Sequence, residues 1–422
     1  MLTCEDNKIL TETGPGTPMG NLLRRYWIPA MLSEELPEPD CPPVRIKIMS
    51  ENLVAFRDSQ NRVGLVDEHC PHRRASMFFG RNEECGLRCV YHGWKFDHSG
   101  QCVDMPSEPA ESNFKDKVTI KSYPCKEFGG IIWTYMGPLE LMPELPVFEW
   151  CLVPESHRYF FRRIQDNNYF QAIEGGIDSS HISFLHRRGG KNDKSPMAQD
   201  RSPKFEVNKT DFGLLIGAKR KVEGQAYWRI TPFLMPWYTM IPPVTGFARG
   251  GHAWVPMDDE HCWQWSFSWE PLTPLSEEAL KRMKEGDDLH APLMPGTFRP
   301  VQNKENDYLI DWELQASGQA FSGIKGIGMQ DAAVQESSGV IANRALEKLG
   351  TSDTAIIVAR RLLINSVKSL QEGEEPIGLG SAAQLLRAVS IMLPEGVPFQ
   401  EGAEEHLQLK PGDYIRSDEK LP

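Results

Sequence analysis

The sequence predicts an α+β fold, on three observations. Residues 44–135 consist mostly of short β-type runs separated by turns, which suggests a small β-sandwich or barrel. Residues 203–270 contain further strand-like runs, and helical patterns occur at 275–285, 331–349 and 353–371. Because strands and helices occupy separate stretches, the pattern favours α+β over a parallel sheet of alternating strands and helices.

Turn residues mark the limits of the expected domains. Residues 12–20 are rich in glycine, proline and threonine, which predicts an extended N-terminal arm over residues 1–24. Four prolines and little periodicity in residues 136–155 are typical of a domain boundary. A small all-β domain is therefore expected at 25–140, followed by a larger α+β domain with an antiparallel sheet at 141–422. The strands expected in the first domain are 44–48, 53–56, 63–66, 87–90, 118–120 and 131–135.

The composition excludes several classes of protein. With 422 residues, 40% of them hydrophobic and 25% charged, the chain can bury a sizeable core, which rules out disorder of the whole chain. Its net charge of −12 argues against binding to nucleic acid or anionic lipid, which favour basic surfaces. No apolar run reaches the ~18 residues of a membrane span, and the polar start is unlike a signal peptide. The nine scattered cysteines then indicate a cytoplasmic protein with free thiols or metal ligands.

Two short Cys/His pairs carry the strongest chemical signal. They are Cys70-Pro-His72 and, after 16 residues, Cys89-Val-Tyr-His92, each on a tight loop after a β-type run. Zinc accepts two cysteines and two histidines, but usually in the order Cys-Cys-His-His. The alternating order suits a Rieske [2Fe–2S] cluster, in which two thiolates hold one iron and two imidazoles hold the other. The simplest interpretation, four unrelated residues, is disfavoured by the paired spacing.

A second group of candidate ligands follows a helical stripe over residues 168–181. Asp178 and His181 are three residues apart and would share a helix face. His181 and His186 are five apart, about 140° around an ideal helix, so the helix must end or kink between them if both reach one metal. Paired histidines are more often structural. Together with a carboxylate, however, two histidines make the facial triad of non-heme Fe(II) oxygenases, which leaves positions open for dioxygen.

The third ligand of such a site must be a later carboxylate. Asp311 and Asp331 have the most apolar or small surroundings, whereas Asp258, Asp287 and Asp288 lie in charged runs. Asp331 is expected to open a helix. The residues alone leave the choice among these carboxylates open.

Both groups resemble motifs of one family, the aromatic-ring-hydroxylating Rieske oxygenases. Cys70-Pro-His72-Arg73 and Cys89-Val-Tyr-His92-Gly-Trp-Lys95 are similar to its Rieske signature. The spacing of Asp178, His181 and His186 is similar to its mononuclear iron motif, and residues 329–336 resemble its C-terminal carboxylate segment. The most specific resemblance is to the phthalate dioxygenase-like branch of this family, in residues 14–20, 24–27, 80–83 and 105–109.

The resemblance implies a set of ligands. Cys70, His72, Cys89 and His92 would hold the [2Fe–2S] cluster of a Rieske domain at 25–140. His181, His186 and Asp331 would hold a mononuclear Fe(II) in a catalytic domain at 141–422. Asp178 would not be a ligand. It would instead bridge His181 of its own chain and His92 of the partner subunit, as an acceptor for both imidazoles.

The resemblance also implies partners and an activity. Electrons would come from NAD(P)H through a separate reductase with FMN and [2Fe–2S], or through a ferredoxin, and O₂ would be the co-substrate. Transfer between subunits requires a closed ring, which would be a homotrimer or a homohexamer. The expected function is that of a terminal oxygenase that hydroxylates an aromatic acid, by phthalate-type cis-dihydroxylation. The alternatives are an O-demethylating or other monooxygenase of methoxy- or aryloxy-aromatic acids, a Rieske electron carrier without oxygenase activity, and a zinc-stabilised binding protein.

The sequence says less about the substrate. Aromatic residues crowd positions 227–247, and we expect most of them in the core and a few in a flat apolar pocket. Arg229 and Arg249 lie in strand-like runs and could bind a carboxylate through two hydrogen bonds. The simpler interpretation of each is an arginine on the surface.

Overall fold

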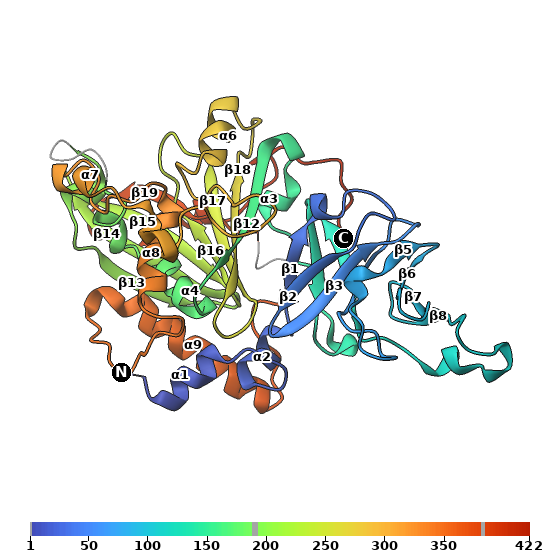
Figure 1. Ribbon diagram of the computed structural model, residues 1–422. Helices are drawn as coiled ribbons and strands as arrows, with labels where there is room; N and C mark the ends of the chain where they lie inside the picture. The colour runs from blue at the N-terminus through green and yellow to red at the C-terminus, as the bar shows by residue number, and fades with distance from the viewer. Residues whose placement is uncertain (1, 188–192, 381–384) are drawn as a thin grey trace.

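The computed structural model describes residues 2–187, 193–380 and 385–422 and has the expected α+β architecture. A small β-rich domain, blue to cyan in Figure 1, lies beside a larger domain built on an eight-stranded antiparallel sheet. The C-terminal tail returns to the small domain, where the carboxylate of Glu419 accepts the backbone N–H of Gly129. Within the described residues, no helix combines the length and apolarity that crossing a bilayer requires.

The small domain consists of three short antiparallel sheets. Two lie in its body, in the orders β1-β11-β10 and β2-β3-β4-β9, and the third, β5-β6-β7-β8, carries one Cys/His loop. The run at 118–120 was expected as a strand but forms none, because the chain pairs only at Gln101 and Thr119 there and the next strand begins at Ser122. The strands are β1 (Trp27–Leu32), β2 (Val44–Ile48), β3 (Glu51–Arg57), β4 (Val63–Asp67), β5 (Arg81–Glu83), β6 (Gly86–Arg88), β7 (Lys95–Phe96), β8 (Cys102–Asp104), β9 (Ser122–Tyr123), β10 (Cys125–Phe128) and β11 (Ile131–Tyr135).

The large domain is organised by one sheet in the order β12-β18-β17-β16-β15-β14-β13, with β19 paired to β15. Its strands are β12 (Arg158–Gln165), β13 (Lys204–Lys209), β14 (Gly213–Val222), β15 (Gln225–Leu234), β16 (Tyr238–Ile241), β17 (Arg249–Pro256), β18 (Cys262–Trp269) and β19 (Val389–Leu393). Every residue of β18 is buried, because both faces of the sheet are covered.

The two faces of β18 differ in chemistry. Trp263, Trp265, Phe267 and Trp269 alternate along one face, where the Phe267 ring stacks on Trp150 with ring centroids 4.9 Å apart. Gln264, Ser266 and Ser268 point to the opposite face. The apolar face forms the core, and the polar face borders the site described below.

Several helices of the large domain lie on the face of the sheet that carries this site (Figure 1). They include α4 (Tyr169–Ile177), which packs on β17, and α8 (Ile327–Ser337), which packs on α4. The longest helix described, α9 (Thr354–Gln371), matches the expected 353–371. The helix expected at 331–349 instead begins at Ile327 and ends at Ser337, so Asp331 lies inside it and does not open it. The remaining α-helices are α3 (Glu149–Leu152), α5 (Pro196–Gln199), α6 (Glu277–Lys284), α7 (Trp312–Ser317), α10 (Phe399–Gly402) and α11 (Glu404–Leu407).

The N-terminal arm is helical, so the expectation of an extended arm was wrong. It forms α1 (Cys4–Thr11) and α2 (Pro18–Leu23), which pack against α9. Thr3 and Thr17 accept hydrogen bonds from the backbone N–H groups of Asp6 and Gly20, and Pro18 occupies the first position of its helix. Capping threonines and a first-turn proline initiate helices, and these local signals prevail over the turn-rich composition.

Candidate metal centres and substrate pocket

The two Cys/His loops meet at one end of the small domain. The first follows β4, and the second joins β6 to β7. The rings of His72 and His92 lie with centroids 4.3 Å apart, and His72 also stacks on Trp94. Cys70 and Cys89 are both buried. The structure thus brings together the four residues that the sequence singled out.

The donor set fits a two-iron cluster better than a single zinc ion. The two thiols face each other, and this contact lowers the pKa of Cys89 to about 6 while it raises the pKa of Cys70. Nδ1 of His72 is buried without a hydrogen-bond partner among the described residues. One zinc ion would need all four donors around a single point. In the described part of the chain, the one group of three side chains close enough to share an ion is a different one.

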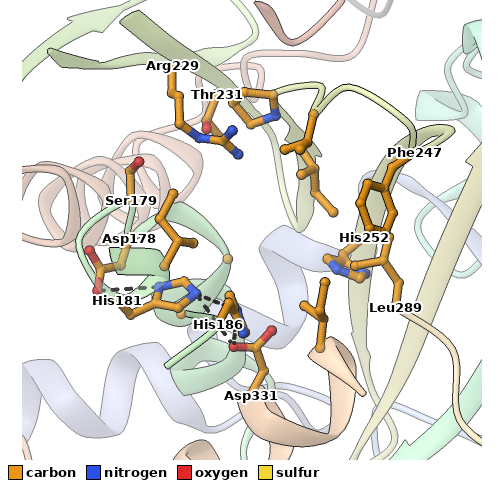
Figure 2. A pocket seen from close by; sticks show the side chains of 18 of the residues that line it. Asp178, Ser179, His181, His186, Arg229, Thr231, Phe247, His252, Leu289 and Asp331 are labelled. Atoms are coloured by element: carbon orange, nitrogen blue, oxygen red, sulfur yellow. Dashed lines mark hydrogen bonds and ion pairs between the residues drawn. The ribbon is translucent and has the colours of Figure 1, made fainter. Parts of the chain in front are cut away.

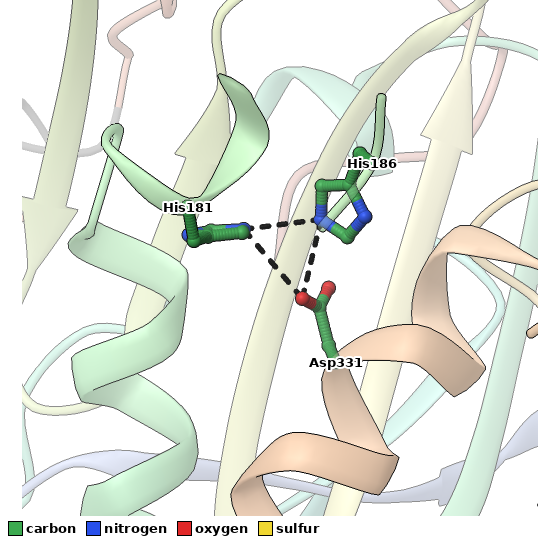
Figure 3. Close-up of side chains that lie close together, drawn as sticks. All are labelled: His181, His186 and Asp331. Atoms are coloured by element: carbon green, nitrogen blue, oxygen red, sulfur yellow. Dashed lines mark hydrogen bonds and ion pairs between the residues drawn. The ribbon is translucent and has the colours of Figure 1, made fainter. Parts of the chain in front are cut away.

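That group is His181, His186 and Asp331 (Figure 3). Nε2 of His181 lies 3.0 Å from Nε2 of His186, and these atoms lie 3.5 and 3.2 Å from Oδ1 of Asp331. Ligands about 2.1 Å from a metal and at right angles to one another are about 3.0 Å apart. The three donors therefore have the spacing of one face of an octahedral metal site.

Asp178 and His181 reach this region from a turn and not from a shared helix face. Helix α4 ends at Ile177 with Asp178 as its C-cap, and His181 begins a short 3₁₀ turn. Oδ1 of Asp178 accepts the backbone N–H of Ser180, and Oδ2 lies 3.6 Å from Nδ1 of His181. Burial would raise the pKa of Asp178, but the hydrogen bond with His181 holds it below its usual range. The helix thus ends earlier than expected, and the carboxylate orients the imidazole.

Two further residues support this site, and Glu174 was expected from the sequence to support its helix or a neighbouring backbone group. Oε1 of Gln330 lies 2.7 Å from Nδ1 of His186 and accepts a hydrogen bond from it, which directs Nε2 toward Asp331. Glu174 is buried and accepts hydrogen bonds from Arg344 and Arg360, which anchor α4. The position of Gln330 beside Asp331 was a signal for the first contact, because ligating histidines usually donate their second N–H. Nothing local pointed to the two arginines as the partners of Glu174.

The other candidate carboxylates have different partners. Asp311 caps α7 by accepting the backbone N–H of Leu314, and Asp258 pairs with Lys47 and His261. Asp287 pairs with Lys325. Asp288 lines the neighbouring cavity without joining the two histidines.

A cavity of about 310 Å³ opens beside the three donors (Figure 2). One wall is the sheet face, with Arg229 and Thr231 from β15 and His252 from β17. Among the aromatic residues of positions 227–247, Phe247 lines this cavity, whereas Trp228, Phe233, Trp237 and Tyr238 belong to the core, as expected for most of them. The apolar lining includes Ile241, Val244, Leu289 and Ile327.

The two arginines differ, and Arg229 is not on the surface. It is only 5% exposed, and its guanidinium extends into the cavity at the end away from Asp331 (Figure 2). Burial lowers its pKa, and Nη1 has no hydrogen-bond partner among the described residues. Arg249 is half-buried and lines a separate polar cavity with Arg387. The alternating pattern of β15 could have shown that Arg229 and Thr231 share a face, but not that this face lines a cavity.

Comparisons with known proteins agree with this geometry. Residues 26–124 match the Rieske [2Fe–2S] domain, and residues 134–392 match a family described as LigXa C-terminal domain like. The oxygenase subunit of 3-chlorobenzoate-3,4-dioxygenase from Comamonas testosteroni is 38% identical over 97% of this chain and 99% of its own length. This chain belongs to the Rieske non-heme iron oxygenases. Another member, the phthalate 4,5-dioxygenase oxygenase subunit of Pseudomonas putida, is 39% identical over 91% of this chain and 90% of its own length.

More distant Rieske oxygenases share the fold. The 5,5'-dehydrodivanillate O-demethylase oxygenase subunit of a Sphingobium species is 32% identical over 89% of this chain and 83% of its own length. Dicamba monooxygenase bound to dicamba superposes with a TM-score of 0.57 at 20% identity, over 83% of this chain and 99% of that one. The reduced complex of oxygenase and ferredoxin in carbazole 1,9a-dioxygenase superposes with a TM-score of 0.56 at 17% identity, over 89% of this chain and 98% of that one.

Family membership confirms the expected class of enzyme and its cofactors. The chain is a terminal oxygenase component with a Rieske cluster and a mononuclear non-heme iron, which uses O₂ and electrons from a reductase. The interpretations as a bare electron carrier or as a zinc-stabilised binding protein are not favoured.

Proposed function

We propose that this Rieske oxygenase cis-dihydroxylates an aromatic acid whose carboxylate binds Arg229. The observation that carries the proposal is the buried guanidinium in the cavity, whose Nη1 has no hydrogen-bond partner among the described residues. Burying a cation without an anionic partner costs several kcal/mol, on the order of the penalty for an isolated buried ion. A carboxylate can accept two parallel hydrogen bonds from a guanidinium and compensate that cost.

The surroundings of Arg229 strengthen the preference for an anion. Arg220 lies on the neighbouring strand β14 and is fully buried. Burial and the nearby Arg229 lower the pKa of Arg220 to about 10, so it keeps its charge near pH 7. Its guanidinium donates to the backbone oxygen of Ser179 and to the side chains of Ser179 and Ser183. Arg220 therefore adds positive potential without competing for the ligand.

The size and lining of the cavity suit one aromatic ring. About 310 Å³ lies at the lower end of the range for small-molecule sites, and the walls between Arg229 and the three donors are largely apolar. A ring held at Arg229 by its carboxylate would extend toward His181, His186 and Asp331. Two relatives are named for aromatic acids of this kind, chlorobenzoate and phthalate.

The ligand assignments belong to the same proposal. Cys70, His72, Cys89 and His92 would hold the cluster, and His181, His186 and Asp331 the mononuclear iron. When bound, the two centres supply electrons and a site for O₂ activation. The protein residues orient the donors: Gln330 holds His186, and Asp178 holds His181.

Electron delivery is proposed to involve other chains. Asp178 is 22% exposed and could accept a second hydrogen bond, from His92 of the partner subunit, in a homotrimer or homohexamer. The donor would be a reductase with FMN and [2Fe–2S], or a ferredoxin such as the one in the carbazole 1,9a-dioxygenase complex. We place the Rieske domain at 25–140, the catalytic domain at 141–422, and the protein in the cytoplasm.

Binding of aromatic acids to the oxidised holoenzyme tests the role of Arg229. Titration calorimetry with phthalate isomers and substituted benzoates should give a dissociation constant that Arg229→Met raises at least about 30-fold, as expected for losing a buried charge-assisted pair. Arg229→Lys should recover part of the affinity. The matched control Arg249→Met, in the neighbouring cavity, should change it less than about twofold. Equal effects of Arg229→Met and Arg249→Met would contradict the proposal.

A further inference from the structure

His252 is a second polar group on the wall of the substrate cavity. It lies on β17, is 8% exposed, and stands across the cavity from His181 (Figure 2). It is not part of the close group of donors formed by His181, His186 and Asp331. The function described so far gives it no role.

The imidazole is held through one nitrogen only. Nδ1 lies 2.9 Å from Nε2 of Gln264, 3.2 Å from the backbone oxygen of Trp265 and 3.4 Å from Oγ of Ser266. These contacts occupy Nδ1 and leave Nε2 as the ring nitrogen that remains for a ligand. Burial lowers the pKa of His252 to about 4, which keeps the ring neutral near pH 7. Nε2 has no hydrogen-bond partner among the described residues, although its ring lines the cavity.

A buried histidine on the same polar face serves as an internal comparison. Nε2 of His290 lies 3.0 Å from Oγ of Ser268, and its ring is 1% exposed and packs against Tyr159. That ring is enclosed by protein on all sides. His252 instead has Nδ1 in the polar stripe of β18 and Nε2 on the cavity side. The arrangement leaves Nε2 available for a ligand.

We propose that His252 forms a hydrogen bond through Nε2 with a second oxygen substituent of the bound aromatic acid, and thereby sets which ring carbons face the iron ligands. The inference rests on the proposed function, since Arg229 provides the first contact. Across β16, His252 aligns with Phe233 of β15, four residues from Arg229, so the backbones that carry Arg229 and His252 are about 16 Å apart. One contact leaves the ring free to turn about its carboxylate, whereas two contacts fix its orientation.

The chemical class that follows is an aromatic carboxylate with a further carboxylate, hydroxyl or methoxy group. An unsubstituted benzoate would leave Nε2 of His252 unpaired in a largely apolar enclosure. A lost neutral hydrogen bond corresponds to about a 3- to 10-fold difference in affinity. Loss of this hydrogen bond should therefore change the affinity modestly and the position of ring hydroxylation more strongly.

Dissociation constants of paired acids test the inference on the oxidised holoenzyme. The ligands are benzoate, the three phthalate isomers, and 3-hydroxy-, 4-hydroxy- and 3-methoxybenzoate. For the best oxygen-substituted acid, His252→Leu should weaken binding about 5- to 10-fold, while benzoate changes by less than about twofold. His252→Gln keeps an N–H donor near the position of Nε2 and should stay within about threefold of wild type. The ratio of product regioisomers should broaden in His252→Leu and return in His252→Gln.

The outcomes separate this inference from the proposed function. Equal weakening for benzoate and for the substituted acids would show that His252 only packs, and would overturn the inference. If wild type binds no aromatic acid, or Arg229→Met has no effect, the proposed function fails first and this inference with it. If His252→Leu does not fold, His252→Gln and His252→Asn replace it, because asparagine is too short to place a donor at Nε2. Identical selectivity in that pair would also overturn the inference.

Discussion

The loops that carry Cys70 to His92 and the segments that carry His181, His186 and Asp331 differ in how they are assembled. In the first region, two short loops of one small domain supply all four proposed ligands within 23 residues. In the second, a turn after α4 and the interior of α8 must meet from positions 145 residues apart. The first arrangement depends on local loop geometry, whereas the second depends on the packing of the whole domain.

The largest effect should come from breaking the local site. Cys89→Ser should remove the cluster, so that iron falls from about three to about one per chain and the brown colour disappears. The three donors of the large domain should still bind their iron, because they share no ligand with the loops. Iron analysis and visible absorbance check this. Loss of all three irons would mean that the two regions fold as one unit.

The reciprocal change tests the distant site. Asp331→Asn removes the charge of the proposed carboxylate ligand, and iron should fall from about three to about two per chain while the visible spectrum persists. Turnover should drop at least about a thousandfold. The control is Asp311→Asn, which changes the carboxylate that caps α7. Wild-type turnover in Asp331→Asn would exclude the assigned ligand.

Asp178 links the two regions if electrons cross between subunits. Asp178→Asn should leave both metals bound, yet slow coupled turnover on the order of a hundredfold by weakening the outer contacts of two histidines. Reduction of the cluster by dithionite should remain fast, and stopped-flow absorbance would follow its reoxidation. Reoxidation at the wild-type rate would remove the bridging role.

Gln330 offers a smaller test of how the distant site is held. Gln330→Leu leaves Nδ1 of His186 without its acceptor, and iron affinity at that site should fall about 10- to 100-fold. Competition with a chelator measures this. Gln335→Leu on the same helix is the control, because Gln335 bonds to Gln165 and not to His186. Similar losses in both variants would point to a general effect on α8.

The smallest expected effect is on stability and concerns the contact between the two domains, where Lys47 of β2 pairs with Asp258 of the large domain. Hydrogen bonds from His261 and Lys47 hold the pKa of Asp258 low despite burial, and Asp258 in turn raises the pKa of His261. The contribution of Asp258 to stability is present above its unfolded pKa of ~3.9. It is lost as the pH falls through the lowered pKa of the folded protein. The His261 contribution is complete below ~6.5 and is lost as pH rises through its raised pKa.

Asp258→Asn should therefore lower the free energy of unfolding by about 1 kcal/mol at pH 6 and by less at pH 9. Thermal denaturation at the two pH values measures the difference. Glu285→Gln breaks an exposed pair with Lys281 and should have little effect at either pH. A loss for Asp258→Asn that grows toward pH 9 would be inconsistent with this assignment.

The contrast also explains what the sequence could predict. The Cys/His loops and five of the six strands expected in the small domain were predicted correctly, because spacing and alternation are local properties. The end of α4 was placed too late, since Ile177, Asp178 and His181 continue the helical spacing while the chain turns at Asp178. The extended arm was wrong for a similar reason, because two threonine caps outweigh the surrounding turn residues.

The substrate cavity could not be predicted because it is a property of the sheet. Arg229 was expected on the surface, since its neighbours in the sequence do not reveal which elements cover β15. The contacts of Gln330 with His186 and of Gln264 with His252 likewise join residues of different segments. A contact between residues that are close in the sequence can be predicted from it. A contact between distant segments cannot, whatever the residue types.

A single turnover under ¹⁸O₂ tests the central claim most directly. The holoenzyme would be reduced in advance, mixed with ¹⁸O₂ and an aromatic acid that binds Arg229, and its product analysed by mass spectrometry. We expect a cis-dihydrodiol of that acid with both labelled oxygen atoms, and little product from Arg229→Met. Formaldehyde with a phenol, or a product with one labelled atom, would contradict the account and identify a monooxygenase.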